Sequence, residues 1–269
     1  MPSMVFRLLF GFVFPLFLQP SSSAQSNLLQ LGLQQSSPSG LRVGFYQYTC
    51  PNAEAIVRDE MTKIISQVPS LAGPLLRMHF HDCFVNTKGP HWDVPTGRRD
   101  GRRSVKQDAL DNLPAPFFDA GRNLFQFFIP KGLDAKDQIV LLGGHTLGTS
   151  HCSSFADRLY NFSGTMMADP SLDKRYLPRL KSKCSNPGDT TTLVEMDPGS
   201  FRTFDASYYR HVARGRSLFA SDQTLMNDAF ARAYVQRQAA VAAAGAYPAE
   251  FFADFAASMV KMGGVQVLT

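Results

Sequence analysis

Two segments of this sequence hold residues whose types and spacing could do chemistry, and each contains a histidine. In the first, Arg77 and His81 are four residues apart, so a helix would place both on one face with Phe80 beside them. A guanidinium and an imidazole that look into one cavity supply a fixed positive charge and a proton acceptor. The pair suits a reaction that needs both.

Two other interpretations fit the same segment. As a strand, it would point His79 and His81 to one side, where they could bind a metal. The leucines and the methionine at 75–78 favour a helix instead. A structural ion pair of His81 with Asp82 is, on spacing alone, at least as common as catalysis. Spacing therefore leaves the function of this segment open.

The second segment, residues 143–148, reads Gly-Gly-His-Thr-Leu-Gly and follows an apolar run over 139–142. Glycines beside His145 would let a flat cofactor approach the backbone closely. The alternative is a buried histidine whose ring is satisfied by a backbone carbonyl. Taken by itself, the segment favours that alternative.

Helical periodicity dominates the elements that must position these residues. The first predicted helix begins behind Pro51 and Asn52 and carries an apolar stripe of Ile56, Val57, Met61, Ile64 and Ile65. Further helices are predicted over 75–85, 117–128, 135–142, 229–244 and 250–262. Residues 88–116 and 164–204 hold Gly, Pro, Asp and Ser in clusters typical of loops. Alternating β-branched runs and internal repeats are absent, so the predicted fold class is mainly α.

Composition narrows the class of protein. The chain has 269 residues, of which 44% are hydrophobic and 18% charged, with 22 phenylalanines. These values argue against a disordered chain and a coiled coil. The net charge of +5 is spread along the chain rather than gathered into a long basic stripe, so we expect no nucleic-acid partner.

The N-terminus has the order of a secretory signal. Arg7 precedes an apolar run of eleven residues, 8–18, and small residues follow up to Ala24. A membrane anchor is the alternative, but the run is too short to span a bilayer. We predict a signal peptide over 1–24, a loose lead-in over 25–40, one folded domain over 41–269 and no membrane contact after cleavage.

Secretion would permit disulfides, and the chain has four cysteines, which allow three complete pairings. They are Cys50, Cys83, Cys152 and Cys184. None forms a C-x-x-C pair, so a zinc ribbon, a thioredoxin motif and thioether-attached haem are not supported.

Together, the two histidine segments resemble the haem motifs of the secreted plant (class III) peroxidases. Arg77-x-x-Phe80-His81-Asp82-Cys83-Phe84-Val85 matches the distal motif, and Gly144-His145-Thr146-Leu147-Gly148 matches the proximal one. The similarity continues in order through further short motifs, which include Thr49-Cys50-Pro51, Leu113-Pro114-Ala115-Pro116, Arg158-Leu159-Tyr160-Asn161-Phe162, Tyr208-Tyr209 and Ser221-Asp222-Gln223. It implies a helical haem peroxidase fold, with haem between distal and proximal halves.

The resemblance implies roles on both sides of the cofactor. His145 would be the axial ligand of haem b, and Asp222 its carboxylate partner. His81 would accept a proton from hydrogen peroxide and return it to the leaving oxygen, while Arg77 stabilises the developing negative charge. Phe80 would keep the pocket dry.

The resemblance also implies a phenol entrance near Pro114, calcium sites and one disulfide. The proximal calcium set is Thr146, Asp197, Ser200, the carbonyl of Thr203 and Asp205, all oxygen donors. Of the distal calcium set, only Asp82 and the carbonyl of Val85 remain. The implied disulfide joins Cys152 and Cys184.

The sequence departs from the family pattern after Val85. Asn86-Thr87-Lys88 leads directly into Gly89-Pro90, which the family places much later, so an internal block on the order of sixty residues is missing, close to the size of a small domain. With it go an asparagine that orients His81 and the usual disulfide partners of Cys50 and Cys83, which could pair with each other. The chain also ends before the family's last turn and cysteine.

These features predict a haem peroxidase fold that is incomplete on the distal side. The expected function is a secreted, monomeric enzyme of the cell wall, apoplast or vacuole that reduces hydrogen peroxide and oxidises phenols, with activity weakened by the deletion. The alternative is a non-catalytic haem- and calcium-binding remnant or a mis-spliced product.

Overall fold

A computed structural model describes residues 40–77, 90, 92–99 and 105–268. All of them belong to one compact unit, Ser36–Thr269. The predicted signal peptide and four predicted distal residues, Phe80, His81, Asp82 and Val85, lie outside the described residues.

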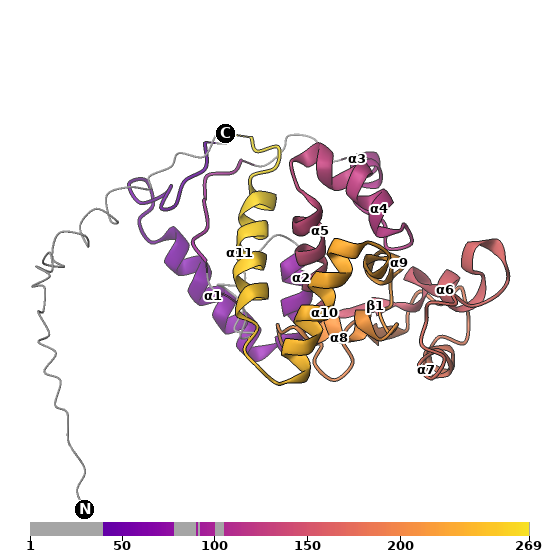
Figure 1. The fold of residues 1–269 in the computed structure, drawn as a ribbon. Helices are drawn as coiled ribbons and strands as arrows, with labels where there is room; N and C mark the ends of the chain where they lie inside the picture. Colours follow the sequence, from indigo (N-terminus) through magenta and orange to yellow (C-terminus); the bar gives the residue numbers. More distant parts are fainter. Residues whose placement is uncertain (1–39, 78–89, 91, 100–104, 269) are drawn as a thin grey trace, which may run out of the picture. The chain divides into compact units, whose positions relative to one another are not determined.

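The described residues form a mainly α fold, as predicted (Figure 1). The helices are α1 (Ala53–Gln67), α2 (Ala72–Arg77), α3 (Lys106–Asn112), α4 (Ala120–Asn123), α5 (Ala135–Leu142), α6 (Ala156–Tyr160), α7 (Leu177–Lys183), α8 (Ser207–Ala213), α9 (Ala220–Gln223), α10 (Ala229–Ala243) and α11 (Ala249–Gly263). Short turns of helix include η1 (Pro69–Leu71), the π-helical η3 (Leu124–Phe128) and η5 (Gly143–Thr146). Two short antiparallel strands, β1 (Thr149–His151) and β2 (Leu193–Glu195), pair with Ser150 opposite Val194.

The predicted helices over 135–142, 229–244 and 250–262 are confirmed to within a residue at each end. The helix predicted over 117–128 begins three residues later, at α4, because the Asp119 carboxylate caps it by accepting from the Arg122 backbone N–H at 2.8 Å. The helix predicted over 75–85 begins earlier, at Ala72, and the structure describes it as far as Arg77.

Both predicted loops were wrong in part. Residues 88–116 contain α3, whose Gln107 and Asp111 side chains hydrogen-bond across one turn at 2.7 Å. Residues 164–204 contain α7 and β2. Pro178 lies in the first turn of α7, where a backbone N–H has no intrahelical partner and its absence costs nothing. The proline that suggested a loop therefore lies at the start of a helix. The three-residue strands are too short to show a sequence period.

The main core lies between α5, α8, α10 and α11. Helix α8 packs against α10, and α11 packs against α5 (Figure 1). Phe204 stacks on Phe251 with ring centroids 5.3 Å apart, and Tyr209 meets Phe251 edge to face. These buried rings make a rigid support for the turn that follows α5.

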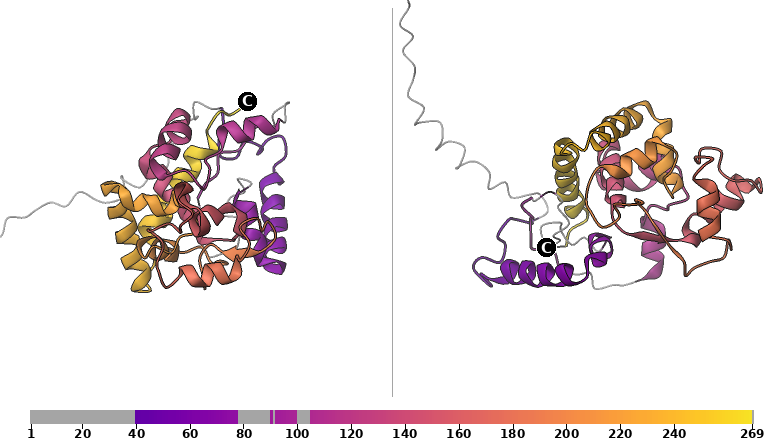
Figure 2. Two further views of the ribbon diagram at one scale, coloured as in Figure 1. Left: turned by 90° about the vertical axis from the view of Figure 1, so that its right-hand side faces the viewer. Right: turned by 90° about the horizontal axis from the view of Figure 1, so that it is seen from below.

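A second core surrounds α6 and α7, which Figure 1 and the right-hand view of Figure 2 place apart from α11. The predicted disulfide between Cys152 and Cys184 is present here, with Cα atoms 5.5 Å apart and both residues buried. Closing this loop stabilises the fold by about 3 to 4 kcal/mol. Cys50 is an exposed free thiol.

Helix α1 is confirmed, but its apolar stripe is only partly buried. Met61 and Ile65 are buried, whereas Ile56, Val57 and Ile64 are 57%, 44% and 40% exposed. Val68 and Leu71, which follow the helix, are exposed as well. An apolar stripe at helical spacing indicates a helix face that is suited to packing. In this structure most of that face of α1 is exposed to solvent.

Candidate functional site

His145 lies in η5, the turn that directly follows α5. Helix α5 begins with a capping box, in which Asp134 and Asp137 each accept from the other's backbone N–H. It ends at Leu142 and is followed by Gly143, where a Cβ would lie 2.6 Å from the Tyr209 hydroxyl and from the ring of Phe251. Only glycine fits there, because the α8 and α11 side chains leave no room for a Cβ.

Helix α2 and the end of the His145 turn approach each other at a pair of glycines. A Cβ built on Gly73 of α2 would lie 3.0 Å from the Cα of Gly148, which has a φ of +90°. The backbone of α2 therefore lies against the end of the His145 turn. Arg77 is the last described residue of α2, about one helical turn beyond Gly73.

Asp222 of α9 holds the imidazole of His145. The Nδ1 of His145 lies 2.9 Å from Oδ1 of Asp222, whose side chain is fully buried, while the His145 side chain is 32% exposed. A carboxylate accepts the Nδ1–H, which leaves the lone pair of the neutral ring on Nε2. Because a buried group covers the Nδ1 edge, the accessible edge of the ring is the one that carries Nε2. This arrangement fits a histidine that binds a metal ion or haem iron.

Aromatic side chains hold the same ring from the sides. Phe219 meets His145 edge to face with ring centroids 5.2 Å apart, and Tyr208 does so at 6.2 Å. Tyr208 also donates its hydroxyl to Oδ1 of Asp222 at 3.0 Å. The two rings shield the hydrogen bond between His145 and Asp222 from water.

Arg158 of α6 supports the loop that leads to Asp222. Its side chain is 1% exposed, and it donates from Nε to Asp169 at 2.7 Å and from Nη1 to three successive backbone carbonyls. Those carbonyls belong to Ser217, Leu218 and Phe219. One guanidinium thus fixes the backbone on which the Phe219 ring and the start of α9 depend.

The predicted proximal calcium ligands lie together in the structure. The Thr146 hydroxyl lies 2.9 Å from Oδ2 of Asp197, 3.4 Å from Oδ1 of Asp205 and 3.5 Å from the carbonyl oxygen of Thr203. The Ser200 hydroxyl contacts Asp205. Asp197 is fully buried.

This oxygen cluster fits a cation better than hydrogen bonding alone. The Thr146 hydroxyl has one proton, which can satisfy one of its three oxygen neighbours. Ser207, which the sequence analysis missed, brings its hydroxyl against both Asp197 and Asp205. Among the described residues, no group of three or more His, Cys, Asp or Glu side chains is arranged to hold a metal ion. Two carboxylates with hydroxyl and carbonyl oxygens are instead the donor set that calcium prefers.

Pro114 lies exposed in the loop between α3 and α4. Two residues later, the carbonyl of Pro116 accepts from the Ser221 backbone N–H at 3.1 Å. The segment is thus tied to the start of the helix that carries Asp222. Phe117 is exposed, and Phe118 packs against Phe127 with ring centroids 6.3 Å apart.

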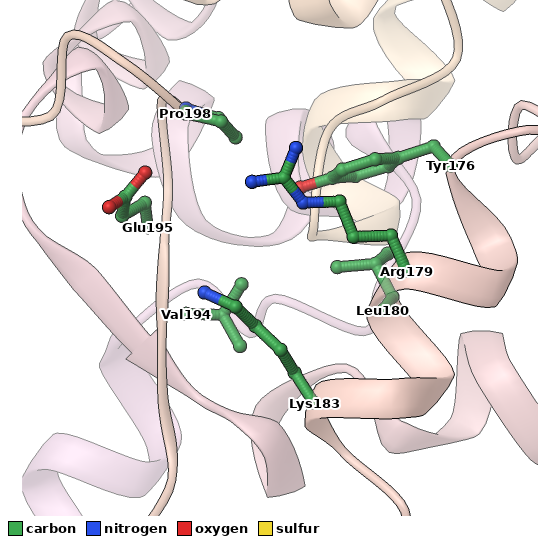
Figure 3. A pocket seen from close by; sticks show the side chains of 7 residues that line it. All are labelled: Tyr176, Arg179, Leu180, Lys183, Val194, Glu195 and Pro198. Carbon is green, nitrogen blue, oxygen red and sulfur yellow. The ribbon is translucent and has the colours of Figure 1, made fainter.

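A small hollow between α7 and β2 is a separate feature (Figure 3). Arg179 and Lys183 extend toward it from α7, opposite Glu195. Its volume of about 10 Å³ holds roughly one water molecule, so it is too small for an organic substrate.

Comparison with known proteins identifies the family. A family model described as peroxidase matches residues 85–241, more than half of the chain. Peroxidase 1 of rice (Oryza sativa subsp. japonica) is 45% identical over 308 residues, which cover 90% of this chain and 93% of the relative. Peroxidase 39 and Peroxidase 27 of Arabidopsis thaliana are 41% and 39% identical over 303 residues each, with 88% and 90% of this chain and 91% and 92% of the relatives covered.

The chain belongs to the peroxidase family. It is a haem-dependent peroxidase of the secreted plant type, with hydrogen peroxide and an electron donor as substrates. The alignment with rice Peroxidase 1 is 308 residues long, which exceeds the 269 residues of this chain, although only 90% of this chain is aligned. The relative therefore has residues, on the order of sixty, that this peroxidase lacks. Among the described residues, no helix has the length and apolar character that a membrane span requires.

Proposed function

We propose that this peroxidase binds haem b through Nε2 of His145 and oxidises small phenols with hydrogen peroxide. The observation that carries the proposal is the hydrogen bond of 2.9 Å between His145 and the buried Asp222. It holds the imidazole in the form that can bind iron and makes the ring more basic. Bound haem supplies what the side chains lack, the transfer of single electrons between peroxide and an organic donor.

On the distal side, we assign proton transfer to His81 and charge stabilisation to Arg77. His81 accepts a proton from one oxygen of hydrogen peroxide and delivers it to the other, which leaves as water. Arg77 stabilises the negative charge that develops between these steps, and Phe80 excludes water. The contact of α2 with the His145 turn at Gly73 supports this assignment, since Arg77 ends that helix.

We place the entrance for phenols at Pro114. Its loop is exposed, and the hydrogen bond from Ser221 to Pro116 holds the loop beside the helix that positions Asp222. A phenol that reaches an exposed haem edge needs only to donate an electron and a proton, so a surface groove suffices.

The missing block leads us to propose a weakened enzyme. An unoriented His81 is a poorer base, and general-base catalysis is worth roughly 10²–10⁴-fold in rate. The apolar face of α1 is open to solvent, with Ile56 57% exposed. The relatives have additional residues that could cover such a face.

We further propose one calcium ion, bound at the proximal site by the five predicted residues with help from Ser207. Thr146 belongs both to this cluster and to the turn that holds His145. Calcium bound there would therefore stabilise the proximal turn itself. A distal ion is not part of the proposal, because Asp82 and Val85 alone are too few ligands.

We propose cleavage of residues 1–24 on export, a loose lead-in over 25–40 and a monomeric enzyme over 41–269. Its destination would be the cell wall, the apoplast or the vacuole.

Reconstitution with haem tests the function. The purified chain should gain a Soret band, and hydrogen peroxide should change that band rapidly. Arg77→Leu and His81→Leu should abolish the change but keep the band, whereas His151→Leu, on the exposed end of β1, should behave like the wild type. A folded chain that never gains a Soret band contradicts the proposal.

The second candidate is a non-catalytic remnant or mis-spliced product, which the abrupt internal gap favours. A remnant would gain the Soret band but show no response to peroxide. Sequencing of the transcript across codons 85–91 tests the mis-splicing. A product without the junction between Val85 and Gly89 would show that the gap is absent from the expressed enzyme.

A further inference from the structure

Tyr208 contacts the same carboxylate oxygen as His145. The Tyr208 hydroxyl donates to Oδ1 of Asp222 at 3.0 Å, and His145 Nδ1 lies 2.9 Å from that oxygen. Oδ2 of Asp222 is buried and has no hydrogen-bond partner among the described residues. The two donors therefore compete for one oxygen.

Burial makes this competition strong. Tyr208 and Asp222 are 1% and 0% exposed. With water excluded at both ends of the contact, the Tyr208 hydroxyl donates to Asp222.

The neighbouring tyrosine makes a different bond. Tyr209 is also fully buried, and its ring centroid lies 5.0 Å from that of Tyr208. Its hydroxyl donates to the backbone carbonyl of Ile139 at 3.2 Å. Of these two adjacent buried tyrosines on α8, Tyr208 donates a hydrogen bond to a carboxylate and Tyr209 donates one to a backbone carbonyl.

We propose that Tyr208 is a positioning residue that weakens the hydrogen bond from His145 to Asp222 and thereby raises the reduction potential of the iron that His145 binds. A carboxylate oxygen that is shared by two donors offers less negative charge to each of them. The imidazole is then less basic and stabilises the oxidised iron less. The inference rests on the proposed function, because it takes His145 as the iron ligand.

The test compares Tyr208→Phe with Tyr209→Phe. In the haem-loaded full chain, spectroelectrochemistry should find a more negative ferric–ferrous potential for Tyr208→Phe and an unchanged potential for Tyr209→Phe. In the haem-free chain, the proton resonance of His145 Nδ1–H should move downfield in Tyr208→Phe alone, as its hydrogen bond strengthens. An unchanged or more positive potential, or an unmoved resonance, overturns the inference.

The haem-free measurement separates the two claims. If the chain binds no haem but the resonance moves, the proposed function fails and the control of the hydrogen bond by Tyr208 stands. If Tyr208→Phe does not fold, 3-fluorotyrosine at position 208 keeps the side-chain shape but makes the hydroxyl a stronger donor. That substitution should move both readouts in the opposite direction, and shifts in the same direction as for phenylalanine overturn the inference.

Discussion

Arg158 and Asp169 form an ion pair in the interior of the second core, with 2.7 Å between Nε and Oδ2 and side chains that are 1% and 4% exposed. The same guanidinium donates to the carbonyls of Ser217, Leu218 and Phe219. The pair therefore connects the second core to the segment that leads into α9, the helix that carries Asp222. The buried charge of Arg158 thus holds the backbone of residues 217–219 in place.

Arg158→Met should destabilise the protein by about 3–5 kcal/mol, because it leaves Asp169 as an uncompensated buried charge and removes one hydrogen-bond donor from each of three carbonyls. Urea unfolding followed by circular dichroism measures the change. Arg216→Met removes an ion pair to Asp173 at a similar distance of 2.8 Å, but its side chains are 33% and 20% exposed, so the effect should be clearly smaller. Equal effects of the two substitutions would contradict the buried role.

The same pair predicts a pH dependence. Burial, the largest influence, raises the pKa of Asp169, but the Ser171 hydroxyl and the Arg158 charge outweigh it and leave the pKa below its ordinary value of 3.8. A carboxyl whose pKa is lowered by folding contributes stability that is fully present above pH 3.8. That contribution is lost as the pH falls through the lowered folded value.

The free-energy difference between wild type and Asp169→Asn should therefore be largest above pH 3.8 and shrink in more acidic solution. Unfolding curves at a series of pH values measure it. A difference that grows as the pH falls would show that folding raises the pKa.

Asp222→Asn should weaken haem retention by about 10- to 100-fold, the usual effect of removing the hydrogen-bond partner of a metal-bound histidine. An amide can donate to Nδ1 of His145, and the ring then carries its proton on Nε2, where iron must bind. Transfer of haem to apomyoglobin measures the loss. Asp157→Asn, on the exposed face of α6, is the matched control.

Calcium should raise the melting temperature of the haem-free chain, since the ion binds the folded oxygen cluster and not the unfolded chain. At a calcium concentration 100-fold above Kd, the gain is about 2.7 kcal/mol. Asp205→Asn should abolish the calcium-dependent part, whereas Asp189→Asn, at a carboxylate that is not part of the oxygen cluster, should keep it. Scanning calorimetry with calcium and with chelator measures both.

The sequence predicted those parts of the fold that depend on local hydrophobic periodicity or on motifs shared with the family. Helices α5, α10 and α11 follow from apolar periodicity, and the pairing of Cys152 with Cys184 followed from the family resemblance. Helix α7 was missed because a proline in its first turn has the same composition signal as a loop.

The supporting residues of the site could not be predicted in the same way. Tyr208 and Arg158 occur in matched motifs, but their roles arise from contacts with Asp222 and with carbonyls 217–219, which are distant in sequence. Ser207 gave no signal, since one serine among many looks ordinary until the fold places it between two carboxylates.

Two adjacent residues of α1 give the sharpest test of its open apolar face. Ile64 is 40% exposed, and Ile65 is 2% exposed. Ile64→Lys should change the free energy of unfolding by no more than about 0.5 kcal/mol, as is usual for surface positions. It should also reduce light scattering in concentrated solution, because it places a charge on an apolar surface that can join two molecules. Ile65→Ala should instead cost about 2–5 kcal/mol and leave scattering by the folded protein unchanged. If Ile64→Lys destabilised as much as Ile65→Ala, the face would be covered in solution and the stripe on α1 would be core after all.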